Sequence, residues 1–264
     1  MEGPSGAATF RTGADAYDRH VGRYTDELAT GLIRVAQVAP GQRALDIGCG
    51  PGAVTRALAA ALGAENVTAI DPSEPFAAAC RDRVPGADVL VGAAEQLPFE
   101  DAAFDVVLSQ LVVNFMDDAP QALSEMSRVT KPGGVVAAAV WDYAEGMTFL
   151  RHFWDAARAV DPDAAARDEG MVMRYCSPPE LEALWSGAGL QDVSTGELHA
   201  SASYDSFEEM WQPLEAGLGP SGAYAKALDP DRRAALKRTF HELLGSPPGG
   251  FTLDARAWYV TGRA

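Results

Sequence analysis

Short apolar runs alternate with amphipathic stretches between residues 42 and 141. Apolar runs of about four to eight residues bounded by turn residues are typical of strands buried on both faces, whereas apolar positions three and four apart are typical of helices. The alternation therefore predicts a parallel sheet covered by helices on both faces. Strands are expected at residues 43–47, 67–71, 88–91, 104–109 and 135–141, with helices at 53–62, 75–83 and 119–129.

The alternation breaks after Trp141. Residues 147–160 and 206–244 are predicted as helical insertions, and the core pattern returns in a helix at 178–189 and in strands at 190–199 and 252–261. The aromatic side chains of this part of the chain either line an apolar pocket or pack the insertions onto the sheet. They are Phe149, Phe153, Trp154, Tyr175, Trp211 and Tyr224.

Three glycines, Gly48, Gly50 and Gly52, follow Asp46 at the end of the first predicted strand. Glycine adopts backbone angles that other residues avoid, and it lets a ligand approach the main chain without a Cβ in the way. The predicted helix at 53–62 follows directly, so its N-terminus faces the same loop. This arrangement predicts a nucleotide-contacting loop between a strand and a helix.

A second acid, Asp71, ends the next strand, at the distance where a ribose hydroxyl pair would be held. A carboxylate offers two acceptors for two adjacent hydroxyls, although Asp71 could instead cap the following segment 73–76. Nicotinamide enzymes also use a glycine loop and such an acid, so Asp71 predicts an adenosine ligand without choosing the cofactor. The acid at Asp46 is unusual for a dehydrogenase strand, which is usually apolar there.

Further motifs in order along the chain decide between the cofactors. The chain resembles the class I S-adenosylmethionine-dependent methyltransferases, in particular the small-molecule subgroup called methyltransferase type 11. The resemblance covers about residues 40–142 and rests on Asp46-x-Gly48-x-Gly50-x-Gly52, Ile70-Asp71-Pro72-Ser73, Ala94-Glu95-Gln96-Leu97-Pro98-Phe99, Phe104-Asp105-Val106-Val107 and Arg128-Val129-x-Lys131-Pro132-Gly133-Gly134.

The resemblance implies an α/β fold with a Rossmann-like, doubly wound, seven-stranded sheet whose last strand is antiparallel, plus helical lid insertions. It implies one domain with a cap. The expected segments are an N-terminal lid at 1–39, the S-adenosylmethionine-binding core at 40–142, an insertion at 143–177, a core continuation at 178–205, a second insertion at 206–250 and the final strand at 251–264.

The resemblance also implies the residues that bind the cofactor. Asp46 would accept a hydrogen bond from the cofactor ammonium group rather than cap a helix, and Arg23 would meet the cofactor carboxylate. Ala93 stands where an acid is common, so Ala94 or Glu95 would take over the adenine contact. The full set is Tyr17, Arg23, Asp46, Gly48, Gly50, Gly52, Asp71, Pro72, Ala94, Glu95 and Gln110.

No strong motif marks a catalytic base. His20 and His152 are candidates, but a lone histidine is more often a packing or surface residue. The segment 109–115 lacks the Asn/Asp-Pro-Pro-aromatic sequence with which many nucleobase and protein-amide methyltransferases hold a planar amine. This difference favours another kind of acceptor.

The amino-acid composition makes several classes of binding partner improbable. The 37 acidic residues exceed the 21 basic ones, which gives a formal net charge of −16 that repels nucleic acid and anionic membranes. Three separated cysteines show no metal-ligand spacing, so no metal is expected. The sequence shows neither a signal-peptide pattern nor a membrane-spanning run, and a cytoplasmic location is expected.

The sequence thus predicts an enzyme that transfers a methyl group from S-adenosylmethionine to a small, apolar or aromatic organic acceptor by in-line displacement, leaving S-adenosylhomocysteine. Two alternatives stay open, a nicotinamide-dependent oxidoreductase and a non-catalytic S-adenosylmethionine-binding protein. The atom that is methylated is not fixed by any motif, and a homodimer is one option for the assembly.

Overall fold

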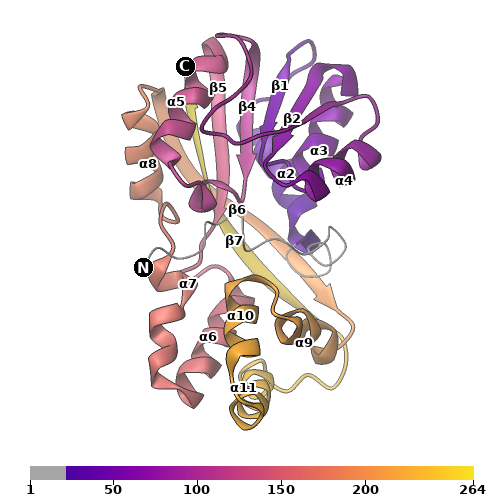
Figure 1. Ribbon diagram of the computed structural model, residues 1–264, viewed down its shortest axis with the longest axis vertical. Helices are drawn as coiled ribbons and strands as arrows, with labels where there is room; N and C mark the ends of the chain where they lie inside the picture. The colour runs from indigo at the N-terminus through magenta and orange to yellow at the C-terminus, as the bar shows by residue number, and fades with distance from the viewer. Residues whose placement is uncertain (1–21) are drawn as a thin grey trace.

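The strands of the computed structural model, which describes residues 22–264, form one sheet in the order β3-β2-β1-β4-β5-β7-β6 (Figure 1). The first five strands are parallel, and β7 lies antiparallel between β5 and β6. The strands are β1 (Ala44–Ile47), β2 (Val67–Asp71), β3 (Asp88–Val91), β4 (Phe104–Gln110), β5 (Thr130–Trp141), β6 (Gln191–Tyr204) and β7 (Phe251–Arg263). This topology confirms the predicted fold class.

Helices cover both faces of the sheet because its central strands are apolar on both sides. All four residues of β1 are buried, as are all five of β2. One face packs against α2 (Thr25–Val35), α3 (Ala53–Leu62) and α4 (Glu74–Arg83), and the other against α5 (Ala119–Val129) and α8 (Pro178–Gly187). On the second face the Trp185 indole Nε1 of α8 donates to the Val136 carbonyl oxygen at 3.0 Å. Burial of these apolar stripes stabilises the layers.

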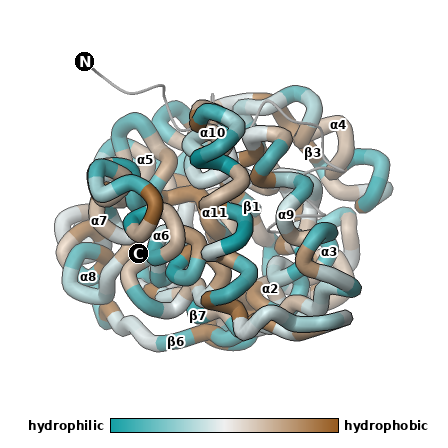
Figure 2. Tube along the Cα trace, turned by 90° about the horizontal axis from the view of Figure 1, so that it is seen from below, coloured by the Kyte–Doolittle hydropathy of each residue, from teal (hydrophilic) through white to brown (hydrophobic). Residues whose placement is uncertain are grey.

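A cap of helices lies at one end of the sheet, where the long strands β6 and β7 extend beyond their neighbours (Figure 1). Figure 2 views the molecule from this end, with hydrophilic and hydrophobic residues alternating along the cap helices. The cap consists of α6 (Thr148–Val160), η5 (Pro162–Arg167), α7 (Glu169–Val172), α9 (Phe207–Ala216), α10 (Gly219–Ala227) and α11 (Pro230–Leu243).

Three details differ from the sequence prediction. The predicted strand at 190–199 continues to Tyr204, because its partner β7 pairs with it along that whole length. The insertion at 206–244 is three helices, the first of which ends at Gly217 in a left-handed conformation with φ 91°. The strand predicted at 135–141 begins earlier, at Thr130, and its pairing with β4 shifts register between Phe104 and Val106.

Aromatic rings hold the cap together. The ring of Phe240 on α11 lies 5.7 Å from that of Phe153 and 6.0 Å from that of Phe149, both on α6. It also lies 5.6 Å from the ring of Phe207 and 6.4 Å from that of Trp211, both on α9. Phe240 thus joins three helices and is fully buried.

We predict that Phe240→Ala lowers the free energy of unfolding by about 3–5 kcal/mol, because it removes a buried ring and leaves a cavity. Leu243→Ala on the same helix is the matched control, since Leu243 is 45% exposed, and it should change stability by less than about 0.5 kcal/mol. Urea unfolding of both variants measures the difference. Equal losses would show that the ring cluster does not stabilise the cap.

Candidate active site

A pocket of about 470 Å³ opens at the carboxyl ends of β1, β2 and β4. Its floor is formed by the loops that follow these strands and by the loop after β3, and its roof by residues of α6, α7 and α10. Ligands of open α/β sheets bind at this edge, because the strand order reverses there and the loops leave a crevice. The pocket joins the sheet to the cap.

The glycine loop is held against β2 by its backbone. The Gly48 and Cys49 N–H groups both donate to the Ile70 carbonyl oxygen, at 2.7 and 3.1 Å. Gly48 has φ 67°, and a Cβ there would lie 2.5 Å from the Val112 side chain. Gly50 has φ 51°, and a Cβ there would meet nothing within 4 Å. The loop therefore requires glycine for its conformation, and at Gly48 also for close packing.

Asp46 points one carboxylate oxygen at the following helix and leaves the other without a partner among the described residues. Its Oδ2 accepts from the Thr55 hydroxyl at 2.6 Å, whereas the buried Oδ1 has no hydrogen bond in that part of the chain. Burial, together with the neighbouring charge of Asp71, raises the pKa of Asp46 to about 7 despite the bond from Thr55. An unpartnered buried acceptor fits a cationic donor.

Both carboxylate oxygens of Asp71 accept hydrogen bonds from backbone N–H groups of the neighbouring loops. Its Oδ2 accepts from the Gly50 N–H and its Oδ1 from the Ser73 N–H, each at 2.8 Å. Burial raises the pKa of Asp71, while the two backbone donors oppose that shift. Each oxygen keeps a further lone pair, and Asp71 lines the pocket with Pro72, so it can brace the loop and still accept from two hydroxyls.

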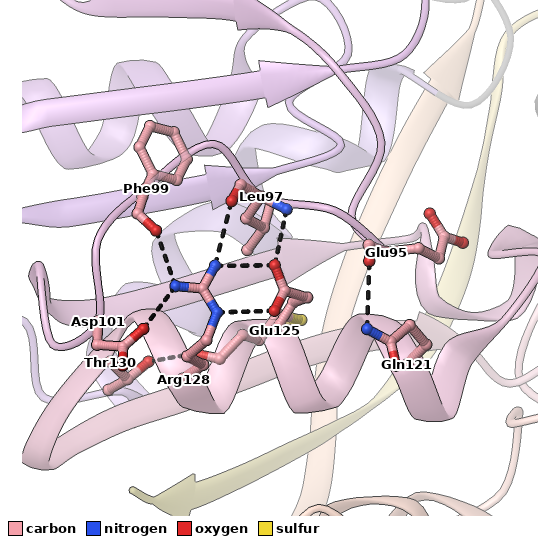
Figure 3. A network of polar contacts seen from close by, with 9 residues as sticks. Glu95, Leu97, Phe99, Asp101, Gln121, Glu125, Arg128 and Thr130 are labelled. Atoms are coloured by element: carbon pink, nitrogen blue, oxygen red, sulfur yellow. Dashed lines mark hydrogen bonds and ion pairs between the residues drawn. The ribbon is translucent and has the colours of Figure 1, made fainter.

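The loop after β3, which carries Ala94 and Glu95, is fixed by Arg128 of α5 (Figure 3). The Arg128 guanidinium donates to the carbonyl oxygens of Leu97 and Phe99, at 3.1 and 2.8 Å, and pairs with the Glu125 carboxylate. Both Ala94 and Glu95 line the pocket. The Glu95 carboxylate, however, also accepts from the backbone N–H groups at 117 and 118, at 3.1 and 3.3 Å.

Gln110 ends β4 and lines the pocket between the glycine loop and α2. Its amide Nε2 donates to the Thr25 carbonyl oxygen at 3.1 Å, and its buried Oε1 has no partner within residues 22–264. The pocket thus brings together Asp46, Gly48, Gly50, Asp71, Pro72, Ala94, Glu95 and Gln110.

The other sequence-predicted residues lie elsewhere. Arg23 pairs with Glu209, donates to the Ser203 carbonyl oxygen at 2.7 Å, and is not among the residues that line the pocket. The His152 ring bonds the Thr148 carbonyl oxygen within α6 at 2.9 Å and also lies outside the lining. Gly52 stands behind the loop as the N-cap of α3. Tyr17 and His20, which the sequence also predicted as site residues, lie outside the described residues.

The roof of the pocket contains residues that the sequence reasoning did not single out. Trp141 is the last residue of β5 and Tyr143 follows that strand, whereas Glu169 and Ser221 come from α7 and α10. Of the aromatic residues named from the insertions, Phe149 lines the pocket. Phe153, Trp154, Trp211 and Tyr224 instead pack against one another and their neighbours inside the cap. No motif marks Glu169 or Ser221, because they lie in insertions.

Residues 22–264 contain neither a metal-binding cluster nor a membrane-spanning helix. No cluster of three or more histidine, cysteine or acidic side chains there is arranged to hold a metal ion. Over the same residues, no helix combines the length and the apolar character needed to cross a membrane.

The fold and the geometry of the site together indicate the class of ligand that the pocket binds. A doubly wound sheet with a glycine loop, two buried carboxylates at neighbouring strand ends and a helix N-terminus beside them is a site for an adenosine-containing cofactor. The last strand, β7, runs antiparallel in the seven-stranded sheet, as the methyltransferase resemblance implied, and it lies between β5 and β6.

Comparison with known proteins identifies the family. A profile described as a methyltransferase domain matches residues 45–138. The chain is 28% identical over 254 residues to a malonyl-acyl-carrier-protein O-methyltransferase of Serratia marcescens, covering 90% of this chain and 93% of that protein. It is 40% identical over 211 residues to a Mycobacterium ulcerans protein named for phthiotriol/phenolphthiotriol dimycocerosates methyl transfer, covering 79% and 66%. It spans about half the length of several other malonyl-acyl-carrier-protein O-methyltransferases.

Solved structures agree at the level of the fold. A phosphoethanolamine N-methyltransferase of Haemonchus contortus superposes with a TM-score of 0.58 at 18% identity, over 95% of this chain and 56% of that one. The cyclase SpnF superposes with a TM-score of 0.57 at 18% identity, over 90% and 80%. The chain belongs to the class I S-adenosylmethionine-dependent methyltransferases. This assignment favours methyl transfer over the nicotinamide-dependent alternative.

We predict that Asp71→Ala weakens the binding of S-adenosylhomocysteine about tenfold to hundredfold, because it removes a charged hydrogen-bond acceptor. Asp71→Asn should lose less, since the amide oxygen can still accept one of the bonds. Asp88→Ala, at an exposed aspartate of the neighbouring β3, is the matched control. Titration calorimetry measures all three, and unchanged affinity in Asp71→Ala would show that the ribose binds elsewhere.

Proposed function

We propose that the protein transfers a methyl group from S-adenosylmethionine to a small organic acceptor with an apolar or aromatic body. The observation that supports this proposal is one continuous pocket, polar at the strand ends and apolar under the cap. Its polar floor fits the cofactor, and Trp141, Tyr143, Phe149 and Leu150 in its roof fit an apolar acceptor. The net charge of −16 argues against a nucleic acid in this role.

The floor residues divide the cofactor between them in this proposal. The free Oδ1 of Asp46 accepts from the ammonium group, and the loop backbone from Gly48 to Gly50 contacts the methionine part. Asp71 accepts from the ribose hydroxyls, Pro72 and Ala94 flank the adenine, and Gln110 offers its amide oxygen. The bound cofactor supplies an electrophilic methyl group on a sulfonium centre.

The protein contributes chiefly alignment and the exclusion of water. In-line displacement requires the nucleophile, the methyl carbon and the sulfur on one line, and holding two reactants so placed greatly lowers the barrier. Apolar side chains from both β5 and α6 line the pocket above the floor, and with both ligands bound they would limit the access of water to the reacting atoms. S-adenosylhomocysteine is the expected product. A cytoplasmic location and a homodimer stay predictions from the sequence.

The decisive experiment is titration calorimetry with S-adenosylhomocysteine, with NADH in parallel. We expect heat with S-adenosylhomocysteine alone, because the Asp46 carboxylate suits an ammonium group that NADH lacks. Binding of NADH alone would overturn the proposal in favour of an oxidoreductase. Binding of S-adenosylhomocysteine without any methylated product from phenols, amines and carbon acids would favour the non-catalytic binding protein.

We predict that affinity for S-adenosylhomocysteine rises between about pH 5.5 and about pH 7.5. The pKa of Asp46 is about 7 in the free protein, so below that pH a proton must leave before the carboxylate can pair with the ammonium group. The dissociation constant should therefore fall by up to about tenfold per pH unit and level off above the pKa. Asp46→Asn should bind weakly with a flatter pH profile, and an unchanged profile would contradict the assigned pairing.

A further inference from the structure

A carboxyl group lies buried in the roof of the pocket, on the acceptor side. Glu169 begins α7, is 2% exposed, and lines the pocket together with Phe149 and Ser221. The next residue, Gly170, packs closely against its surroundings, because a Cβ there would lie 2.7 Å from the Tyr143 carbonyl oxygen and 2.9 Å from the Arg151 guanidinium. The backbone beside Glu169 is therefore tightly packed.

One buried donor orients the Glu169 carboxylate without neutralising it, since the Trp154 indole N–H donates to its Oε2. The backbone groups of Glu169 itself and of Ser221, at the start of α10, also oppose the rise of its pKa. Two carboxylate oxygens offer about four acceptor sites. Capacity for further hydrogen bonds therefore remains on a side chain that borders the pocket.

The adjacent acid, Asp168, takes the positive charges of this region. Arg151 and Arg158 of α6 both pair with Asp168, and the Gly170 N–H donates to it at 2.9 Å. Burial alone would raise the pKa of Asp168, but these partners hold it below the usual range. Glu169 has no arginine partner among the described residues, and burial, aided by the charge of Asp168, raises its pKa to about 7. The pKa values of two neighbouring acids are thus shifted in opposite directions, which is typical of acid–base sites.

We propose that Glu169 binds the reacting hydroxyl or amine of the acceptor and takes up its proton during methyl transfer. This inference rests on the proposed function and names the acceptor class, an apolar or aromatic molecule that carries an O–H or N–H group. A carboxylic acid is disfavoured as the acceptor when Glu169 is ionised, because its charge would face the Glu169 carboxylate.

The step balances without any further reactant. A bond forms between the acceptor oxygen or nitrogen and the methyl carbon while the carbon–sulfur bond breaks, and that bond's electron pair stays on sulfur. The acceptor proton passes to a Glu169 carboxylate oxygen and leaves to water with the product. The products are a methylated acceptor, the neutral thioether S-adenosylhomocysteine and one proton.

A purely structural role for Glu169 is the competing explanation, since an acid near a helix N-terminus stabilises the helix. Other charged or titratable groups close to it are Asp168, Arg151 and Arg158, with Tyr224 on α10 donating to Asp161 at 3.3 Å. Glu169→Gln retains the side-chain shape and an acceptor for Trp154 but removes the titration. Glu215→Gln, at an exposed position of α9, is the matched control.

The first measurement is the binding of phenol, aniline, anisole and benzoate to the protein saturated with S-adenosylhomocysteine, followed by ligand-observed NMR. These probes share one ring and differ in the group that would meet Glu169. We expect phenol or aniline to bind about tenfold more tightly than anisole and benzoate, and Glu169→Gln to lose this preference. Preferred binding of benzoate, no binding of any probe, or a preference that survives in Glu169→Gln would overturn the proposal.

The second measurement separates titration from structure. A carboxyl whose folded-state pKa is raised destabilises the protein as it ionises, so the melting temperature of the unmodified chain should fall as the pH rises from about 5 to about 8. Glu169→Gln should lose part of that fall, and Glu215→Gln should not. For any acceptor turned over, kcat should drop about hundredfold in Glu169→Gln, and the loss of rate below the Glu169 pKa should disappear. An equal rate and pH profile in both variants would leave Glu169 with a structural role only, and overturn the proposal.

Binding of S-adenosylhomocysteine distinguishes a failure of the proposed role of Glu169 from a failure of the proposed function. Glu169→Gln should retain the affinity of the unmodified chain, because Glu169 lies in the roof rather than the floor. Failure of the unmodified chain to bind would overturn the proposed function itself. Normal binding with no effect of Glu169→Gln on probe preference would overturn only the role of Glu169.

Discussion

The Asp71 carboxylate is the interaction on which the site depends. It joins the end of β2 to the Gly50 N–H of the neighbouring loop and to the Ser73 N–H that precedes α4. The two bonds from Gly48 and Cys49 to the Ile70 carbonyl oxygen reinforce the same junction. A loop with three left-handed glycines would otherwise have many conformations, and fixing it in advance reduces the entropy that ligand binding must overcome. The functional and structural interpretations of Asp71 are therefore two aspects of one role.

Two buried acids that have no cationic partner within residues 22–264 mark the two halves of the pocket. Asp46 in the floor and Glu169 in the roof each have a pKa raised to about 7, whereas Asp168, behind the roof, holds two arginines. A buried carboxyl without a cation destabilises the free protein, and such unfavourable groups are common where a ligand supplies the missing partner. In the proposed function the floor acid pairs with the cofactor ammonium group, while the roof acid accepts a proton from the acceptor. The proposal thus divides the pocket electrostatically between the cofactor and the acceptor.

The strands and helices of the core were predicted well from the sequence. They are determined by sequence patterns of a few residues, as are the motifs of the glycine loop. Alternating strands and helices, and the acids at Asp46 and Asp71, follow from patterns that span only a few residues. The cap could not be predicted to the same degree, because Phe153, Trp154 and Trp211 have the same apolar helical spacing whether they line a pocket or pack against one another. The position of Glu169 in the roof depends on contacts among α6, α7 and α10. Because α10 lies far from α6 and α7 in the sequence, no local spacing of residues predicts these contacts.

The division of the structure into a sheet and a cap suggests how one fold can support different reactions. The structure shares its fold with an N-methyltransferase and with a cyclase, so the sheet alone does not determine the chemistry. Loops at the strand ends are fixed by backbone hydrogen bonds within the sheet, whereas the roof is formed by helices that touch the sheet mainly through the extended β6 and β7. The cap can therefore change its lining without disturbing the floor. Under the proposed function, acceptor choice would follow from the few side chains of the cap that line the pocket, and among them Glu169 is the acidic group proposed to accept a proton.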